Sequence, residues 1–219
     1  MTKYFQRELE KIKKRILSLG SLVEERVRIV TKAIEERNAD TAQDIIRLDY
    51  EIDESEVEVE EECLKILALH QPVAIDLRFL IAVIKINSDL ERIGDQAVNI
   101  AQRVVSIAKR QNVAFYFDYS GMAQKAANML KMSLDALVNL DVDLGFKVVM
   151  MDDEVDAIQK DAYDQIKKAI QEDSHHITYL INLFLISRHL ERIGDHATNI
   201  AEEVIYLIEG DIIRHGKYS

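Results

Sequence analysis

Four pairs of acidic residues, each spaced four apart, have the residue types and the spacing of cation ligands. Residues four apart lie on one face of a helix, so each pair presents two carboxylates one turn apart. Carboxylate oxygens suit hard cations such as Mg²⁺, Mn²⁺ or Ca²⁺, and carboxylates also bridge iron. The chain has a single cysteine, which excludes a site built from thiolates. The candidate metal ligands are Asp49, Asp53, Glu91, Asp95, Asp152, Asp156, Glu191 and Asp195.

An internal repeat relates these pairs to one another. Residues 90–101 (LERIGDQAVNIA) and residues 190–201 (LERIGDHATNIA) are identical at ten of twelve positions, at an offset of 100. Upstream, residues 49–53 (DYEID) match residues 152–156 (DDEVD) at an offset of 103. Two matched motifs in the same order indicate two copies of one structural unit in tandem.

Long helices must position these pairs. One proline and seven glycines in 219 residues are too few turn formers for a many-stranded sandwich or barrel. Apolar residues recur at three- and four-residue steps, which is typical of packed helices, and Asp40 with Gln43 is predicted to cap the second one. The predicted fold is all-α: two tandem three-helix bundles, over residues 1–112 and 113–219, with the boundary in residues 111–120. The six helices are expected at about 9–38, 40–69, 74–110, 121–139, 142–171 and 176–209.

The distances from the turns predict that the pairs meet. The pair at residues 49 and 53 lies about 21 residues before Pro72, and the pair at 91 and 95 lies about 21 after it. In an antiparallel hairpin that rises about 1.5 Å per residue, both pairs are level, about 30 Å from the turn. The second half repeats this arrangement around Ser174. A coiled-coil register also places Glu91 and Glu191 in the apolar seam, where a carboxylate needs a cation, a proton or a route to water.

Two simpler interpretations of the acidic residues stay open. Residues 49–62 contain nine acidic residues in fourteen, and such runs are usually a solvated face. Glu91 is also within reach of neutralisation by Arg92, by Arg103 or by a base of the first helix. His189 and His196 of the second copy correspond to Asp89 and Gln96 of the first. Neither histidine is therefore a ligand that both sites could share.

The charge balance excludes several classes of protein. Lys and Arg total 28 against 39 Asp and Glu, and the net charge of −11 has the wrong sign for a nucleic-acid or anionic-membrane binder. The longest apolar stretches are well short of the roughly 20 residues that a membrane span needs. We therefore expect a soluble intracellular protein that neither binds nucleic acid nor inserts into a membrane.

Two stretches of the sequence carry a family resemblance. Residues 71–101 (QPVAIDLRFLIAVIKINSDLERIGDQAVNIA) and 188–210 (RHLERIGDHATNIAEEVIYLIEG) resemble the two signature helices of the PhoU family, regulators of bacterial phosphate uptake. The resemblance implies two three-helix bundles and metal ions at the E/D-x-x-x-D pairs, with iron, Mn, Mg and Zn as candidates. The second copy departs from the first by lacking Pro72 and the sequence of residues 76–78.

The resemblance also implies a function and partners. It implies a cytoplasmic negative regulator of phosphate uptake and of phosphate-starvation signalling, often a homodimer. Such a protein acts between the ATPase subunit of the phosphate ABC transporter and a PhoR-type sensor histidine kinase. We therefore predict a metal-binding adaptor.

Two alternatives to this function remain. The first is a structural helical adaptor without metal. The second is a carboxylate-bridged dimetal enzyme, but ferritin-like sites use Glu-x-x-His, and here Gly94 and Gly194 stand three residues after Glu91 and Glu191. The sequence also has no glycine-rich phosphate loop and no nucleophile–base pair, so we predict that the protein is not an enzyme.

Overall fold

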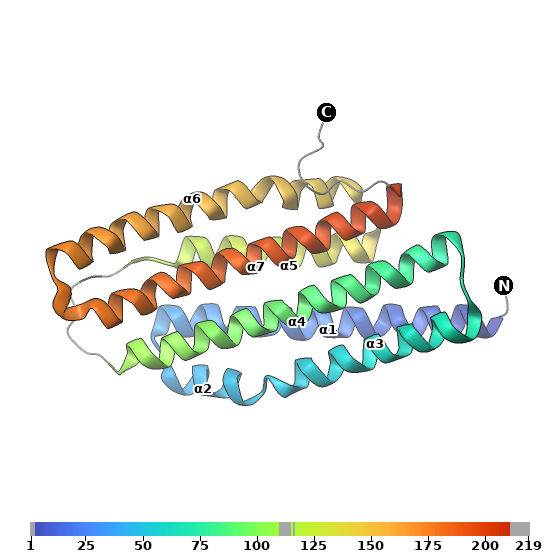
Figure 1. The fold of residues 1–219 in the computed structure, drawn as a ribbon, viewed down its shortest axis with the longest axis horizontal. Helices are drawn as coiled ribbons and strands as arrows, with labels where there is room; N and C mark the ends of the chain where they lie inside the picture. The colour runs from blue at the N-terminus through green and yellow to red at the C-terminus, as the bar shows by residue number, and fades with distance from the viewer. Residues whose placement is uncertain (1–2, 110–114, 116, 211–219) are drawn as a thin grey trace.

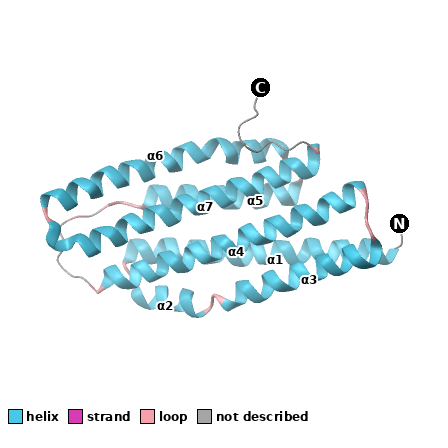
Figure 2. Cartoon of the chain, in the orientation of Figure 1, coloured by secondary structure: helices cyan, strands magenta, loops and turns pink. Residues whose placement is uncertain are grey.

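The computed structural model describes residues 3–109, 115 and 117–210, and its helices lie side by side along one long axis (Figure 1). Among these residues every regular element is a helix (Figure 2). None of the described helices has the length and apolar content that crossing a lipid bilayer requires. The elements are α1 (Lys3–Glu36), α2 (Ala39–Arg47), α3 (Tyr50–His70), α4 (Ala74–Ala108), α5 (Ser120–Asn139), α6 (Val142–Glu172), the 3₁₀ turn η1 (Ser174–His176) and α7 (Ile177–Glu209).

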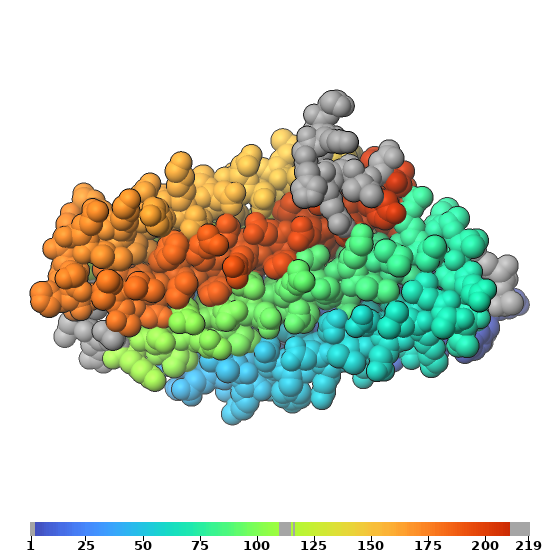
Figure 3. Space-filling model, in the orientation of Figure 1, coloured from blue at the N-terminus to red at the C-terminus, as the bar shows by residue number. Residues whose placement is uncertain are grey.

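The helices form the two predicted bundles. The first contains α1, α4 and the α2–α3 segment, and the second contains α5, α6 and α7 (Figure 1). The longest interface joins α4 to α7, which run next to each other across the face in Figure 3, and α1 also packs against α5. The all-α class and the two three-helix bundles are thus confirmed. The predicted boundary between residues 112 and 113 lies outside the described residues and stays a prediction.

The prediction of one helix over residues 40–69 is wrong, because α2 and α3 are separate helices. Asn38, not Asp40, caps α2: its side-chain oxygen accepts from the backbone N–H groups of Asp40 and Thr41, both at 3.1 Å. The helix is interrupted at Leu48, which ends α2, and Asp49 therefore lies at the N-terminus of α3. The interruption places Asp49 and Asp53 at the positive end of the α3 dipole, which favours negatively charged side chains in the first turn.

The turns that set the level of the acidic pairs lie where the sequence places them. Gln71 ends α3 in the left-handed conformation, with φ of 45°, and Pro72 follows it. In the second bundle the Asp173 carboxylate accepts from the His175 backbone N–H at 2.9 Å and starts η1. Both hairpins are therefore antiparallel helix pairs with short connections.

The predicted seam is right at several positions, such as Leu80 and Gly94, but wrong at Glu91 and Glu191. Glu91 and Glu191 are half-buried, and Asp95 and Asp195 are more exposed than they are, so no carboxylate of the four pairs lies inside the apolar core. The buried positions of α4 include Leu90, both Ile93 and Gly94, and Ala97. The reason is that α4 packs against α1, α2 and α3 on one side and α7 on the other, so its buried face is wider than a coiled-coil stripe. The acidic pairs stand at the edge of that face.

The two glycines of the repeated motif should respond differently to alanine. A Cβ at Gly94 would lie 2.9 Å from Ile52 Cδ1 and 3.2 Å from Ile52 Cγ2, whereas a Cβ at Gly194 would meet its nearest atoms at 3.6 Å. Overpacking costs about 1–3 kcal/mol, and replacing a helical glycine by alanine gains up to about 1 kcal/mol. We expect Gly94→Ala to be less stable than Gly194→Ala in urea unfolding. Equal stabilities would show that α3 yields freely at this contact.

Candidate metal centres

The second acidic cluster (Asp152, Asp156, Glu191, Asp195) brings together carboxylates from α6 and α7. One oxygen each of Asp156, Glu191 and Asp195 lies within 4.8 Å of the other two. Two oxygens bound to one cation lie at most twice the metal–oxygen distance apart, about 4.2 Å for Mg²⁺ and about 4.8 Å for Ca²⁺. The three oxygens therefore fit a single hard cation, with little or no movement of the side chains.

Mutual repulsion within the second cluster shows in its proton affinities. Partial burial raises the pKa of Asp195 to about 6, and repulsion from the three other carboxylates of the cluster acts in the same direction. Partial burial and then Asp156 raise the pKa of Asp152, against which the Thr198 hydroxyl acts by donating a hydrogen bond at 3.3 Å. Each carboxylate thus lies in the field of the others, and a cation would relieve that repulsion.

The first acidic cluster (Asp49, Asp53, Glu91, Asp95) is also assembled, but less tightly. Partial burial, followed by repulsion from Asp53 and Asp95, raises the pKa of Asp49. Partial burial and then Asp95 raise the pKa of Glu91. Within the described ranges, however, no three of these carboxylates bring oxygens within 4.8 Å of one another. In both hairpins the carboxylates are thus near enough to repel one another, and oxygens converge within 4.8 Å only in the second, among the described residues.

A buried arginine lies beside the first cluster. The Arg26 side chain of α1 is 7% exposed and donates to Glu51 at 3.0 Å. Arg26 also lowers the pKa of Asp49, in opposition to the effect of burial. The first cluster thus has a partial counter-charge from α1, whereas no arginine or lysine is among the groups that shift the pKa values of Asp152 and Asp195 in the second.

The two histidines of α7 face α4 and do not join the acidic clusters. His196 Nδ1 lies 2.8 Å from Asp89 Oδ1, and His189 Nδ1 lies 2.9 Å from Gln96 Oε1. Residue 89 thus contacts residue 196, and residue 189, the repeat equivalent of 89, contacts residue 96, the repeat equivalent of 196. The contacts cross the α4–α7 interface symmetrically.

The sequence profile of the PhoU domain matches residues 16–104 and residues 119–204. The chain belongs to the PhoU family. Each matched range covers one three-helix bundle, so the family's domain is the repeated unit seen in the structure.

Individual PhoU proteins are similar to this chain over nearly its whole length. A Pseudomonas putida phosphate-specific transport system accessory protein PhoU homolog is 36% identical over 216 residues, covering 98% of this chain and 84% of that protein. The crystal structure of PhoU from Pseudomonas aeruginosa has a TM-score of 0.91, 36% identity, and coverage of 94% of this chain and 100% of that one. The phosphate transport system regulatory protein PhoU from Streptococcus pneumoniae has a TM-score of 0.89 at 28% identity, with 96% and 100% coverage.

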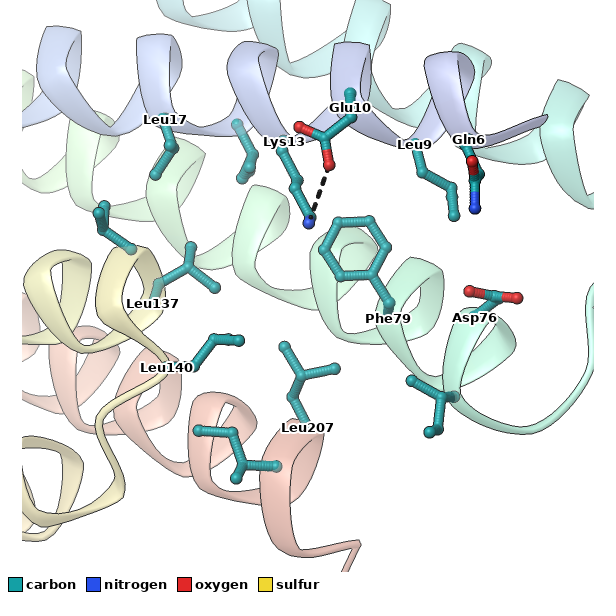
Figure 4. Close-up of a pocket in the computed structure, with 14 residues that line it drawn as sticks. Gln6, Leu9, Glu10, Lys13, Leu17, Asp76, Phe79, Leu137, Leu140 and Leu207 are labelled. Atoms are coloured by element: carbon teal, nitrogen blue, oxygen red, sulfur yellow. Dashed lines mark hydrogen bonds and ion pairs between the residues drawn. The ribbon is translucent and has the colours of Figure 1, made fainter. Parts of the chain in front are cut away.

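The PhoU fold of this chain also has an open groove away from the acidic clusters. The groove has a volume of about 620 Å³ and lies between α1, α4, α5 and α7 (Figure 4). Lys13 reaches into it, with its ammonium 3.2 Å from a Glu10 oxygen and 5.7 Å from the centre of the Phe79 ring. The groove offers apolar contact area rather than reactive groups. Its apolar lining includes Leu9, Ile75, Phe79, Leu137, Leu207 and Ile208.

Sequence reasoning did not find three residues that shape the clusters of this PhoU protein. Thr198, which donates to Asp152, replaces Val98 of the first copy, and this difference within the repeat is the signal that could have revealed it. Glu56 raises the pKa of Glu91, but it lies within an acidic run that offers no distinguishing pattern. Arg26 is one of several bases of α1, and only the tertiary structure shows that it faces Asp49.

Proposed function

We propose that this chain is a cytoplasmic accessory regulator of phosphate transport that represses phosphate uptake and phosphate-starvation signalling. The PhoU relatives are named as accessory proteins of the phosphate-specific transport system, and their similarity covers nearly the whole chain. The proposed partners are the ATPase subunit of the phosphate ABC transporter and a PhoR-type sensor histidine kinase. The proposed assembly is a homodimer, and the protein is not an enzyme.

The convergence of carboxylates from two helices carries the metal-binding part of the proposal. Asp156 of α6 meets Glu191 and Asp195 of α7 with oxygens within 4.8 Å, a fit for one hard cation. The first cluster is proposed as the weaker of two sites. Bound cations would neutralise two strongly acidic surfaces of a chain whose net charge is −11. The metal thereby sets the charge that the adaptor presents to its partners, and the open alternatives for its identity are iron, Mn, Mg and Zn.

A binding experiment separates this adaptor from one that works without metal. Binding of the purified transporter ATPase subunit would be measured with chelated protein, with metal-loaded protein, and with the Glu91→Ala/Glu191→Ala variant. Elemental analysis of each sample gives the metal content. We expect the loaded protein to bind more tightly than the chelated protein, and the variant to bind alike in both conditions.

The outcomes distinguish the two roles. Equal affinity of all three samples for the ATPase subunit would leave the structural adaptor and remove the metal from the mechanism. No binding to the ATPase subunit in any metal state would contradict the proposed adaptor function at the transporter.

A further inference from the structure

The groove between α1, α4, α5 and α7 has a repeat-related counterpart at the opposite end of the molecule. There, the ends of α1 and α4 and the start of α7 enclose a cavity of only about 20 Å³, which has room for about one water molecule. Repeat equivalents line the two places. They are Ile34 and Leu137, Glu35 and Val138, and Arg37 and Leu140, each at an offset of 103, and Ile107 and Leu207 at an offset of 100.

The backbone confirms that the two places are equivalent. Arg37 follows the end of α1 with φ of 49°, and Leu140 follows the end of α5 with φ of 53°. The next residues, Asn38 and Asp141, donate their backbone N–H groups to carbonyls five residues earlier, at 3.1 and 3.0 Å. Both helices therefore end with the same turn, and the groove and the small cavity are one position of the fold seen in its two copies.

The small cavity is small because the linker between α4 and α5 fills that end. Phe117 and Tyr119 of the linker are 7% and 3% exposed, and their ring centres lie 4.9 Å apart. The Tyr119 hydroxyl donates a hydrogen bond to the backbone carbonyl of Leu183 in α7. Two aromatic side chains and one hydrogen bond thus close this end of the four-helix arrangement.

The segment that corresponds to this linker at the open end is the one that follows α7. The linker follows α4, and residues 211–219 (DIIRHGKYS), which lie outside the described residues, follow α7 in the same way. Phe117 is nine residues after the end of α4, and Tyr218 is nine residues after the end of α7. The segment also begins at the groove, because Leu207 and Ile208 in the last turn of α7 line it (Figure 4).

The groove presents apolar side chains that this segment could cover. Ile75 is 72% exposed, Val138 56% and Leu140 58%. Exposed apolar area of this kind is unfavourable in water and marks a surface that binds something. The segment supplies Ile212 and Ile213 as well as the ring of residue 218.

The charges of the groove and the segment are also complementary. Glu10 and Asp76 line the groove, and Glu10 is paired with Lys13. Within the described ranges no ion pair joins Asp76 to a base. The segment brings Arg214 and Lys217, so that a base can approach Asp76 when the apolar residues are in contact.

We propose that residues 211–219 bind in the groove of their own chain and close it as the linker closes the opposite end. The occupant is thus a segment of this chain, not a partner or a second copy. Another molecule can use the apolar surface of the groove only when this segment leaves it. The proposal does not depend on metal binding or on the proposed regulatory function.

A tryptophan reporter tests the proposal in the full chain. The sequence has no tryptophan, so Tyr218→Trp gives a single fluorophore. We expect emission at a shorter wavelength than in the urea-unfolded chain, because the indole is packed against apolar groups. Adding Val138→Lys should shift the emission of the native protein to longer wavelength, since it places an ammonium in the apolar contact and repels Arg214 and Lys217.

A matched control uses the same substitution elsewhere. Val57 of α3 is 49% exposed, close to the 56% of Val138, and it does not line the groove. We expect Val57→Lys to leave the emission unchanged. Circular dichroism would show that both lysine variants stay folded.

Proteolysis gives a second readout without the tryptophan. Trypsin cleavage after Arg214 and Lys217 would be followed by mass spectrometry in the chain without a reporter. We expect these cleavages to be about tenfold slower than in Val138→Lys, because cleavage requires the segment to leave the groove. The Val57→Lys variant should be cleaved there at the wild-type rate.

Three results would overturn the proposal. The first is native emission equal to that of the unfolded chain together with cleavage rates that Val138→Lys does not change. The second is an equal effect of Val138→Lys and Val57→Lys on both readouts, which would indicate only a general effect of charge. The third is emission that moves to longer wavelength on dilution, which would assign the groove to the segment of a second copy.

Discussion

Metal-free Asp195→Asn protein should melt at a higher temperature than metal-free wild-type protein at neutral pH. Partial burial, and then repulsion from the other carboxylates of the second cluster, raise the pKa of Asp195 from 3.8 to about 6. The folded state therefore binds a proton more tightly than the unfolded state does, so that stability falls as pH rises from about 4 to about 6. The amide removes this penalty, so its advantage should be largest above pH 6 and should fade as pH falls towards 4.

The same substitution should weaken the response to metal. A cation at 100 times its dissociation constant stabilises the folded state by about 2.7 kcal/mol, which is a shift of several degrees in melting temperature. Removing one of three converging carboxylates should reduce or abolish this shift. The carboxylates of the second cluster thus lower the stability of the metal-free protein. Differential scanning calorimetry without and with metal measures the metal-free melting temperature and the shift that metal causes.

A control variant makes the result specific. Asp164 is an exposed carboxylate of α6 outside the cluster, and Asp164→Asn changes the net charge equally. Equal shifts of the metal-free melting temperature in Asp195→Asn and Asp164→Asn would contradict the proposed destabilising repulsion among the carboxylates of the second cluster. An unchanged metal response in Asp195→Asn would remove Asp195 from the ligand set.

Replacement of Lys85 by methionine should be strongly destabilising. Its partner Glu203 has a side chain that is 3% exposed, and the substitution removes the ammonium 3.2 Å away. Breaking a fully buried pair costs about 3–5 kcal/mol, because one charge stays in a poorly solvated place. The Lys85 side chain is 40% exposed, so water screens the pair and we expect about 2 kcal/mol in urea unfolding.

A second substitution tests the origin of this loss. Lys85→Met/Glu203→Gln should recover most of the stability, because the buried negative charge is then absent. A double variant as unstable as Lys85→Met would show that lost packing of the lysine stem, and not the charge of Glu203, causes the effect.

Most of the fold was predictable because the sequence repeats itself. The repeated motif at residues 90–101 and 190–201 gave the number of bundles, and Pro72 gave the turn between the third and fourth helices. The break at Leu48 was not predictable, since apolar residues around it keep a helical period on both sides. Helical periodicity shows only which face of a segment is buried. Because α2 and α3 both pack against α1 and α4, the pattern continues across the interruption.

The acidic clusters were predictable in composition and level but not in depth. Spacing from the turns predicts that the carboxylates of each hairpin lie at one level, because helix rise per residue is nearly constant; as a set of metal ligands the eight residues stay a prediction. The predicted burial of Glu91 and Glu191 was wrong. A coiled-coil register assumes that a helix packs along a single stripe, whereas α4 has neighbouring helices on two sides.

The crosswise pairing of positions 89 and 96 between the repeats is the contact pattern of a two-fold symmetric dimer, here formed within one polypeptide. A fragment holding a single repeat would leave the partner-facing side of its long helix uncovered, and should self-associate or recombine with the complementary fragment. Fusion into one chain frees the two halves of that interface from having to stay identical. Mutation could then change one end of the interface without the other, a division of labour that two copies of one subunit cannot achieve.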